Sequence, residues 1–331
     1  MKSMNDPCIN DSTDIDLETL LRLSRERSWR RFGRRIKFYV PSFIRYENEY
    51  YRCNPDAFPS ISITGRHCAL RCSHCGGRIL ESMIPAPTPK RLAKVLRDIV
   101  RRGAVGCLIS GGCLPDGSVP LGNFLDVLAE VRKESSLKMA VHTGFVDENI
   151  AGRLAEIGVD AALIDVIGST ATIREVYHLD ASVEDYDRSL QTLHQSGVPL
   201  VPHVVVGLHY GELRGEFNSL RIIAKYNVSA VVIVALRPIE GTYMEDISPP
   251  SPEDIARILV EARLVLPDTP LVLGCARPLP PHRIRTDALA VESGVNGIAH
   301  PSRDAIKLAK ALDLSISFSQ LCCSQIYEDW V

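Results

Sequence analysis

The chain has 331 residues, of which 45% are hydrophobic and 24% are charged, proportions typical of a globular protein with a real core. Its formal net charge of −2 at pH 7 excludes a general affinity for nucleic acid or membrane surfaces, and no run of about 18 apolar residues is present to span a bilayer. The polar N-terminus lacks a signal-peptide core, so we expect a cytoplasmic protein whose ten cysteines are thiols, metal ligands or catalytic groups rather than disulfides.

The first predicted element is a basic helix, which we place in an N-terminal extension covering residues 1–58. Between Leu20 and Lys37 a single acid, Glu26, stands among eight basic side chains: Arg22, Arg25, Arg27, Arg30, Arg31, Arg34, Arg35 and Lys37. A charge run of this kind is usually a solvated face. The alternative is a docking surface for an acidic protein partner.

From residue 59 to 313, eight short apolar runs alternate with amphipathic stretches of helical periodicity. The runs cover residues 61–65, 106–112, 137–144, 161–168, 199–208, 230–238, 270–278 and 295–301. They are apolar throughout, as parallel strands covered on both faces should be, and eight strand–helix units predict a closed (β/α)8 barrel of the TIM type. An open doubly wound sheet is the alternative, but no G-x-G-x-x-G motif follows the first strand.

Ligands of such a barrel bind at the C-terminal ends of its strands. Polar or otherwise special residues gather at these predicted ends, which indicates one large site: the Cys68 loop, Ser110, Gly111, Gly112, His142, Asp165, Gly207, Arg237 and Cys275.

Three cysteines, Cys68, Cys72 and Cys75, follow the first predicted strand in the spacing C-x3-C-x2-C. Structural zinc normally takes four protein ligands as two paired knuckles, and the sequence has no second CxxC. A four-iron cluster is usually held by four thiolates, so three close thiolates can hold three irons and leave the fourth open to a small molecule. We therefore predict an iron–sulfur cluster here, rather than three unrelated thiols in a surface loop.

This motif resembles that of the radical S-adenosylmethionine (radical SAM) superfamily. The resemblance implies that the open iron of a [4Fe-4S] cluster chelates S-adenosylmethionine, and that an electron from the cluster releases a 5′-deoxyadenosyl radical that abstracts a substrate hydrogen. Where the family usually has an acidic residue after its glycine pair, this chain has Cys113. The resemblance also implies cofactor-binding positions at Ser110, Gly111, Gly112, Asp165, Gly207 and Arg174 or Arg237, with His142, His203 and His209 as orienting groups or, alternatively, structural histidines.

A tail, residues 314–331, carries Cys322 and Cys323. An extended run of about 3.3 Å per residue from Ser315 could climb on the order of 25 Å from the bottom of the barrel to the top, where Cys275 ends the seventh strand. These three cysteines could hold an auxiliary [4Fe-4S] cluster, with Cys53, Ser324 or an exogenous group as fourth ligand. The alternative is that Cys275 is a small buried residue and the vicinal pair is incidental.

Stretches spread over residues 36–325, among them ISITGRHCALRCSHCGG and LGCARP, are most similar to the archaeal two-component lipoyl synthases, which are biotin-synthase-like. This resemblance implies a sulfurtransferase that inserts sulfur from the auxiliary cluster into a protein-bound octanoyl group. It also implies an octanoylated lipoyl-carrier protein, a paralogous second subunit and an electron donor such as ferredoxin as partners.

Two other functions stay open. One is a different biotin-synthase-like radical SAM enzyme, performing biotin synthase-type sulfur insertion, a radical rearrangement or metallocofactor maturation. The other is an iron–sulfur binding or assembly protein without turnover. The stretches that match the S-adenosylmethionine pocket argue against the second, because a storage protein needs no adenine or ribose contacts.

Overall fold

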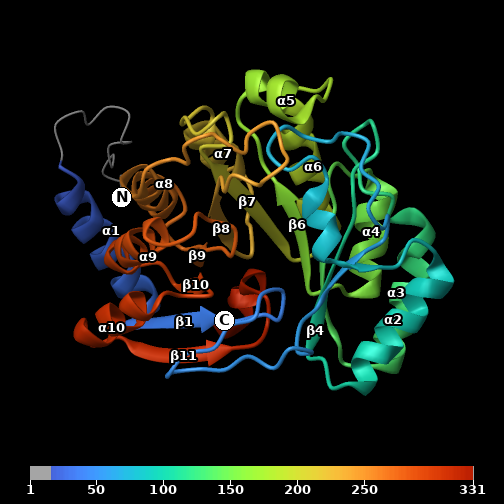
Figure 1. Cartoon of the computed structure of the whole chain (residues 1–331), viewed down its shortest axis with the longest axis horizontal. Helices are drawn as coiled ribbons and strands as arrows, with labels where there is room; N and C mark the ends of the chain where they lie inside the picture. The colour runs from blue at the N-terminus through green and yellow to red at the C-terminus, as the bar shows by residue number, and fades with distance from the viewer. Residues whose placement is uncertain (1–15, 331) are drawn as a thin grey trace, which may run out of the picture.

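The computed structural model describes residues 16–330, so residues 1–15 of the expected extension and Val331 of the expected tail lie outside the described residues. At the centre of the described part is one sheet of eleven strands in the order β11-β1-β10-β9-β8-β7-β6-β5-β4-β2-β3. Every pairing in it is parallel. Helices cover the outer face of this curved sheet, which forms a half-barrel (Figure 1).

The strands are β1 (Arg35–Tyr39), β2 (Ser60–Ser62), β3 (Ile84–Pro85), β4 (Gly106–Ser110), β5 (Lys138–His142), β6 (Ala161–Asp165), β7 (Leu200–Val206), β8 (Val231–Ala235), β9 (Leu271–Leu273), β10 (Gly297–Ala299) and β11 (Ser315–Ser319). The α-helices are α1 (Leu17–Phe32), α2 (Pro89–Arg101), α3 (Leu125–Glu134), α4 (Glu148–Ile157), α5 (Thr170–Tyr177), α6 (Val183–Ser196), α7 (Glu216–Ile223), α8 (Pro252–Val265), α9 (His282–Ser293) and α10 (Arg303–Ala311). Three 3₁₀ helices complete the set: η2 (Arg78–Ser82), η3 (Gly122–Phe124) and η4 (Cys323–Asp329).

The predicted fold class is confirmed, and each of the eight predicted runs contains a strand: β2 and β4 to β10. Helix α8 starts as its sequence indicates, since Ser251 Oγ accepts a hydrogen bond of 3.0 Å from Asp254 N and Pro252 occupies the first helical position. The strands lie in order of sequence from β4 to β10, as expected for successive strand–helix units.

The expectation of a closed barrel is wrong, because the sheet has two free edges, β11 and β3, within residues 16–330. In a closed eight-stranded barrel the last strand would neighbour the first, but here β1 takes the free side of β10, with Lys37 opposite Gly297. At the other edge β3 is two residues long and ends in Pro85, which has no N–H to donate to a further strand.

Both flanks of the expected barrel contribute a strand to the sheet. Strand β1 lies between β10 and β11, and Phe38 stands opposite Phe318. The boundaries at residues 58 and 313 stay predictions, but residues 35–39 and 315–319 belong to the sheet rather than to a separate extension or a loose tail. Helix α1 also packs on the body, where Leu20 and Leu21 are buried with side chains of α8 and α9.

The C-terminal helix η4 lies inside the curve of the sheet and contacts β6, β8, β9 and β10 (Figure 1). Ile326 is fully buried there. The Tyr327 hydroxyl donates a hydrogen bond to the carbonyl oxygen of Asp160, the residue before β6. The Asp329 carboxylate accepts hydrogen bonds from the side chains of Lys37 and Tyr39 in β1. The tail therefore fills the interior of the half-barrel toward the N-terminal ends of the strands.

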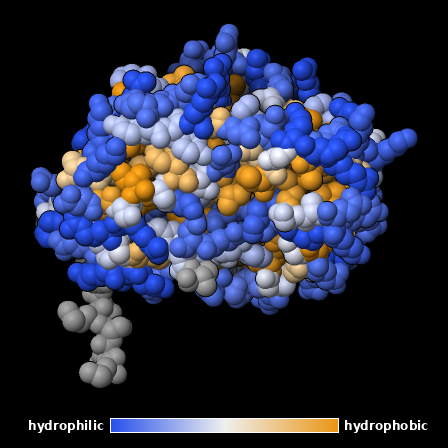
Figure 2. Space-filling view, turned by 90° about the horizontal axis from the view of Figure 1, so that it is seen from below, coloured by the Kyte–Doolittle hydropathy of each residue, from blue (hydrophilic) through white to orange (hydrophobic). Residues whose placement is uncertain are grey.

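The face seen from below the view of Figure 1 is mostly hydrophilic, and its hydrophobic residues gather in separate patches (Figure 2). Within residues 16–330, no helix combines the length and the apolar character that crossing a membrane requires.

Candidate iron–sulfur and cofactor site

The three-cysteine loop follows β2 and is held by the ends of β4 and α5. Ala69 N donates to Cys113 O at 2.8 Å, and Ser73 N donates to Val176 O at 2.8 Å. Arg71 adopts φ 44°, a left-handed conformation that lets the chain turn between the first two cysteines. The loop is therefore fixed at both ends by backbone hydrogen bonds from separate strand–helix units.

Within this loop, Cys72 Sγ, a ring nitrogen of His74 and Cys75 Sγ all lie within 4.8 Å of one another, and the described part of the chain holds no other such group of three. A hydrogen bond from the Cys72 thiol, with a smaller contribution from His74, lowers the pKa of Cys75 to about 4 although burial opposes it. Cys68 lies beside them, since its thiol contributes to the raised pKa of Cys72. The donor set suits a cluster that takes thiolate ligands. His74 was not predicted, although its place inside the motif could have indicated it.

The end of β4, residues 110–112, packs directly on the cysteine loop. Gly112 N donates to Thr64 Oγ1 at 2.7 Å. A Cβ at Gly112 would lie 2.1 Å from His67 O and 2.5 Å from Cys68 Cα. The glycine therefore lets the two backbones approach, so its position is explained by packing as well as by the predicted cofactor contact.

The ends of β5 and β6 bring His142 and Asp165 together, and His203, in the middle of β7, is paired with Asp165 in the sheet. His142 Nε2 lies 3.6 Å from Asp165 Oδ1, and the two imidazole rings are 6.3 Å apart. The side chains of His142 and Asp165 are 28% and 31% exposed, so the pair stays reachable. His203 Nδ1 donates to Val201 O at 3.1 Å.

His142, Asp165 and His203 shift one another's pKa values. Although burial opposes it, the charge of His142 lowers the pKa of Asp165 to about 2. Burial lowers the pKa of His142, but Asp165 outweighs it and raises that pKa above its ordinary value. Burial lowers the pKa of His203 to about 4. At neutral pH the group therefore presents a carboxylate beside a neutral His203.

The carboxylate and the cysteine loop belong to one site. Burial raises the pKa of Cys113 to about 12, and Cys68 and Asp165 both add to this rise. Burial also raises the pKa of Tyr177, again with contributions from Asp165 and Cys72. The Tyr177 ring lies 5.4 Å from that of His74. Neither Cys113 nor Tyr177 was among the predicted site residues.

Other predicted cofactor residues take different positions. Gly207 has φ +72°, and its N–H donates to the buried Glu216 carboxylate at 2.8 Å, so it forms the turn after β7. Arg174 is exposed on α5 and Arg237 is exposed after β8. Arg237 lines a pocket of about 590 Å³ together with Arg78, whose guanidinium packs over the 238–242 segment.

The second cysteine group lies in the interior of the half-barrel. Cys322 and Cys323 are buried in the core that contains Ile326, and Cys275 packs against this core. Burial and then Cys322 raise the pKa of Cys275, while a hydrogen bond from Cys323 lowers the pKa of Cys322 to about 7. The three thiols are thus neighbours, although their sulfur atoms do not all lie within 4.8 Å of one another.

Two candidates for a fourth ligand of this group differ in position. Ser324 Oγ lies 3.4 Å from Cys322 Sγ. Cys53 is buried on the segment between β1 and β2, where its N–H donates to Tyr46 O. Of the two, Ser324 is the one beside the cysteine group.

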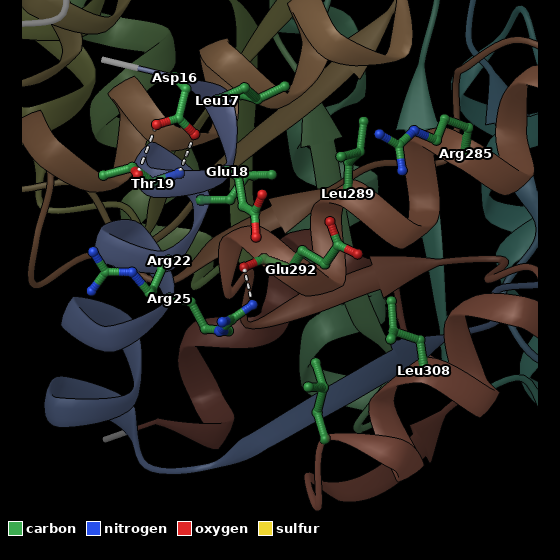
Figure 3. Close-up of a pocket in the computed structure, with 12 residues that line it drawn as sticks. Asp16, Leu17, Glu18, Thr19, Arg22, Arg25, Arg285, Leu289, Glu292 and Leu308 are labelled. Carbon is green, nitrogen blue, oxygen red and sulfur yellow. Dashed lines mark hydrogen bonds between the residues drawn. The ribbon is translucent and has the colours of Figure 1, made fainter.

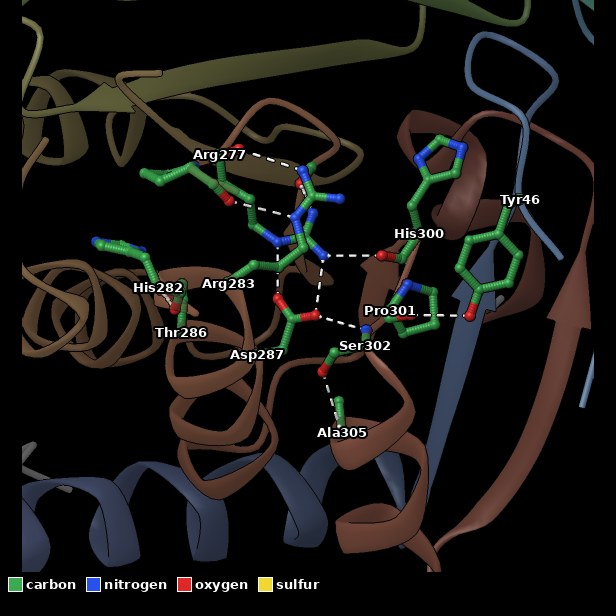
Figure 4. A network of polar contacts seen from close by, with 12 residues as sticks. Tyr46, Arg277, His282, Arg283, Thr286, Asp287, His300, Pro301, Ser302 and Ala305 are labelled. Atoms are coloured by element: carbon green, nitrogen blue, oxygen red, sulfur yellow. Dashed lines mark hydrogen bonds and ion pairs between the residues drawn. The ribbon is translucent and has the colours of Figure 1, made fainter. Parts of the chain in front are cut away.

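A buried ion pair stands next to Cys275. The Arg277 guanidinium donates to both Asp287 oxygens at 2.7 and 3.1 Å, and both side chains are completely buried (Figure 4). Arg277 also donates to His300 O, and Asp287 accepts from Ser302 N, so the network ties the ends of β9 and β10 to α9. The positive charge of Arg277 acts to lower the pKa of Cys275 against the effect of burial.

The basic residues of α1 are partly engaged with the rest of the chain. Arg31 Nε lies 2.7 Å from Asp268 Oδ1, and Arg25 donates to the Glu292 carbonyl. A cavity of about 740 Å³ between α1, α9 and α10 is lined by residues of both charges, including Glu18 and Arg22 (Figure 3). A docking function for this helix stays a prediction.

The sequence model of the family described as "Radical SAM superfamily" matches residues 62–216. The chain is 30% identical over 164 residues to a biotin synthase of Prochlorococcus marinus, covering 48% of this chain and 47% of that protein. It is 25% identical over 264 residues to a 7,8-didemethyl-8-hydroxy-5-deazariboflavin synthase of Archaeoglobus fulgidus, covering 73% of this chain and 78% of the relative. The chain spans about half the length of the first biotin synthases that it matches.

Among solved structures, methylornithine synthase (PylB) has a similar fold, with a TM-score of 0.64, 14% identity, and coverage of 98% of this chain and 95% of that chain. The likeness to this structure shows the fold, while the sequence matches show that residues 62–216 are similar to the radical SAM superfamily and that part of the chain is similar to biotin synthases. Members of this superfamily bind a [4Fe-4S] cluster and S-adenosylmethionine, and the loop with Cys68, Cys72 and Cys75 lies within the matched residues. The finer likeness to lipoyl synthases stays a prediction.

Proposed function

We propose that this chain is a radical SAM sulfurtransferase with two iron–sulfur sites. Cys68, Cys72 and Cys75 would hold the cluster that binds S-adenosylmethionine, and Cys275 with the vicinal pair Cys322-Cys323 would hold an auxiliary cluster that donates sulfur. The observation that carries the proposal is the course of the tail, since β11 and η4 return the vicinal pair to the interior beside Cys275. A radical enzyme with a single cluster has no need of this second group.

The bound cluster would supply the electron that cleaves S-adenosylmethionine and so provides a radical able to take hydrogen from an unactivated carbon. Asp165, anionic at neutral pH, would accept hydrogen bonds from ribose hydroxyls. Gly112 would leave the backbone of β4 open to the methionyl group. His203, neutral at pH 7, can take part in hydrogen bonds without adding a charge to the site.

As substrate we propose an octanoyl group carried on a lysine of a lipoyl-carrier protein, which makes the chain a lipoyl synthase component. Carrier domains are typically acidic, and the exposed arginines of α1 offer charge complementarity. A paralogous second subunit and a ferredoxin-type electron donor would complete the system. The biotin synthase-like homologues support sulfur insertion in general more directly than this particular substrate.

The test is an anaerobic assay of the reconstituted protein with S-adenosylmethionine, a reductant and an octanoylated carrier peptide. We expect 5′-deoxyadenosine together with a peptide mass increased by sulfur. Cys275→Ala should still form 5′-deoxyadenosine but add no sulfur.

Two outcomes would contradict parts of the proposal. Absence of 5′-deoxyadenosine would exclude the radical chemistry itself. If 5′-deoxyadenosine forms but no sulfur is added to the octanoyl peptide, the lipoyl assignment fails, and the alternatives are another biotin synthase-like substrate, a radical rearrangement or metallocofactor maturation.

A further inference from the structure

Gln325, on η4, is buried with both ends of its carboxamide unpaired. Its side chain is 1% exposed, and neither Nε2 nor Oε1 has a hydrogen-bond partner. Among the described residues it is the one side chain in which two polar atoms are left this way. An unpaired buried polar group is destabilising, so a partner for this amide is expected.

Gln325 lies one turn after Cys322, the extended residue that precedes η4. Gln325 N donates to Cys322 O at 3.0 Å, which closes the turn between the two residues. Cys322 and Cys323 are buried in the core against which Cys275 packs. The unpaired amide therefore belongs to the neighbourhood of the second cysteine group.

A trapped water is a poor partner for this amide, because a buried water needs two to four polar partners. The side chains of β6, β8 and β9 in the core that contains Ile326 of η4 include Ala161, Leu163, Val232, Val234 and Val272, which offer a water no hydrogen bond. An iron–sulfur cluster offers partners of both kinds, because its sulfur atoms accept from an N–H and an iron without a thiolate takes an oxygen lone pair.

We propose that Gln325 is the amide contact of the auxiliary cluster held by Cys275, Cys322 and Cys323, with Nε2 donating to a cluster sulfur. This inference rests on the proposed second cluster and adds a residue that the cysteines alone do not indicate. A hydrogen bond to sulfur stabilises the reduced cluster, since it offsets the added negative charge. Gln325 would thus be a positioning residue that sets the reduction potential.

The test uses Gln325→Leu in a Cys68/Cys72/Cys75 triple-alanine background, where the auxiliary cluster is the one remaining cluster. Gln320→Leu, in the same tail but partly exposed, is the matched control. Titration followed by electron paramagnetic resonance should give a more negative midpoint potential for Gln325→Leu and an unchanged one for Gln320→Leu. Iron bound per chain should stay close to that of the parent protein.

A second readout does not depend on the potential. Without iron, Gln325→Leu should melt at or above the temperature of the parent, because an unpaired buried amide has been replaced by an apolar side chain of similar size. On cluster loading, the rise in melting temperature should be smaller than in the parent. An unchanged potential and an equal rise would overturn the role of Gln325. A parent that binds no iron in this background would instead show that the second cluster is absent, and would overturn both proposals.

Discussion

Asp165 and His142 face each other from neighbouring strand ends, 3.6 Å apart, and each holds the other in its charged form. Because the pKa of His142 is raised and that of Asp165 is lowered to about 2 in the folded protein, the pair stabilises the fold fully between their ordinary values, 3.8 for the carboxyl and 6.5 for the imidazole. This stability is lost as the pH rises through the folded pKa of His142.

We therefore expect Asp165→Asn to lower the pKa of His142 below its ordinary value, because burial alone then acts on the ring. A pH titration of the imidazole by NMR measures this directly. The loss of unfolding free energy should be about 1 kcal/mol or less for a pair this accessible, and larger at pH 5.5 than at pH 8. A His142 pKa that stays raised in the variant would contradict the assignment.

Gly112 is the second residue on which the site depends. Gly112→Ala places a Cβ 2.1 Å from His67 O and 2.5 Å from Cys68 Cα, so the loop must move. We expect the variant to bind less iron per chain after anaerobic reconstitution. Gly152→Ala is the control, because nothing lies within 4 Å of its Cβ position in α4, and it should bind iron as the parent does with up to about 1 kcal/mol of added stability.

The sequence could indicate Gly112 as a site residue but not its contact with Cys68. The glycine pair at a strand end is visible in the chain, whereas the approach of two backbones from separate units depends on how β4 and the loop after β2 pack. Tyr177 was missed for a similar reason, since it comes from α5 and the sequence does not show that this helix packs on the cysteine loop.

Among the secondary-structure elements, η4 fills the interior of the half-barrel, where it contacts β6, β8, β9 and β10. Its Ile326 side chain is fully buried. We expect Ile326→Ala to lower the unfolding free energy by about 2–5 kcal/mol, because a cavity would remain among strands that do not move. Ile284→Ala, at a position 39% exposed on α9, should cost about 0.5 kcal/mol or less. Urea unfolding measures both, and equal small losses would show that η4 is not part of the core.

The eight inner strands were predictable because each is a continuous apolar run, as parallel strands covered on both faces require. β1 and β11 were not, because RIKFY carries two basic residues and SISFS alternates polar with apolar residues. The number of residues after Ser315 was enough to predict that Cys322 and Cys323 could reach Cys275. The return of the tail into the interior as a 3₁₀ helix was not predictable, since SQLCCSQIYEDW has no helical periodicity.

At the scale of the whole molecule, the Arg277–Asp287 pair ties the ends of β9 and β10 to α9 beside the second cysteine group. We expect Asp287→Ala to lower the unfolding free energy by about 3–5 kcal/mol, because a buried guanidinium would lose its counter-charge. Glu253→Ala removes the exposed partner of Arg285 and should cost about 1 kcal/mol or less. Comparable losses in the two variants, measured by urea unfolding, would contradict a structural role for the buried pair.

The proposed function requires two iron–sulfur clusters in one chain, one on the loop after β2 and one between β9 and η4. The most direct measurement is iron and sulfide per chain after anaerobic reconstitution, for the parent and for a variant with Cys275, Cys322 and Cys323 all changed to alanine. Two four-iron clusters predict about eight irons in the parent and about four in the variant. About four irons in both would contradict the claim and remove the proposed sulfur donor.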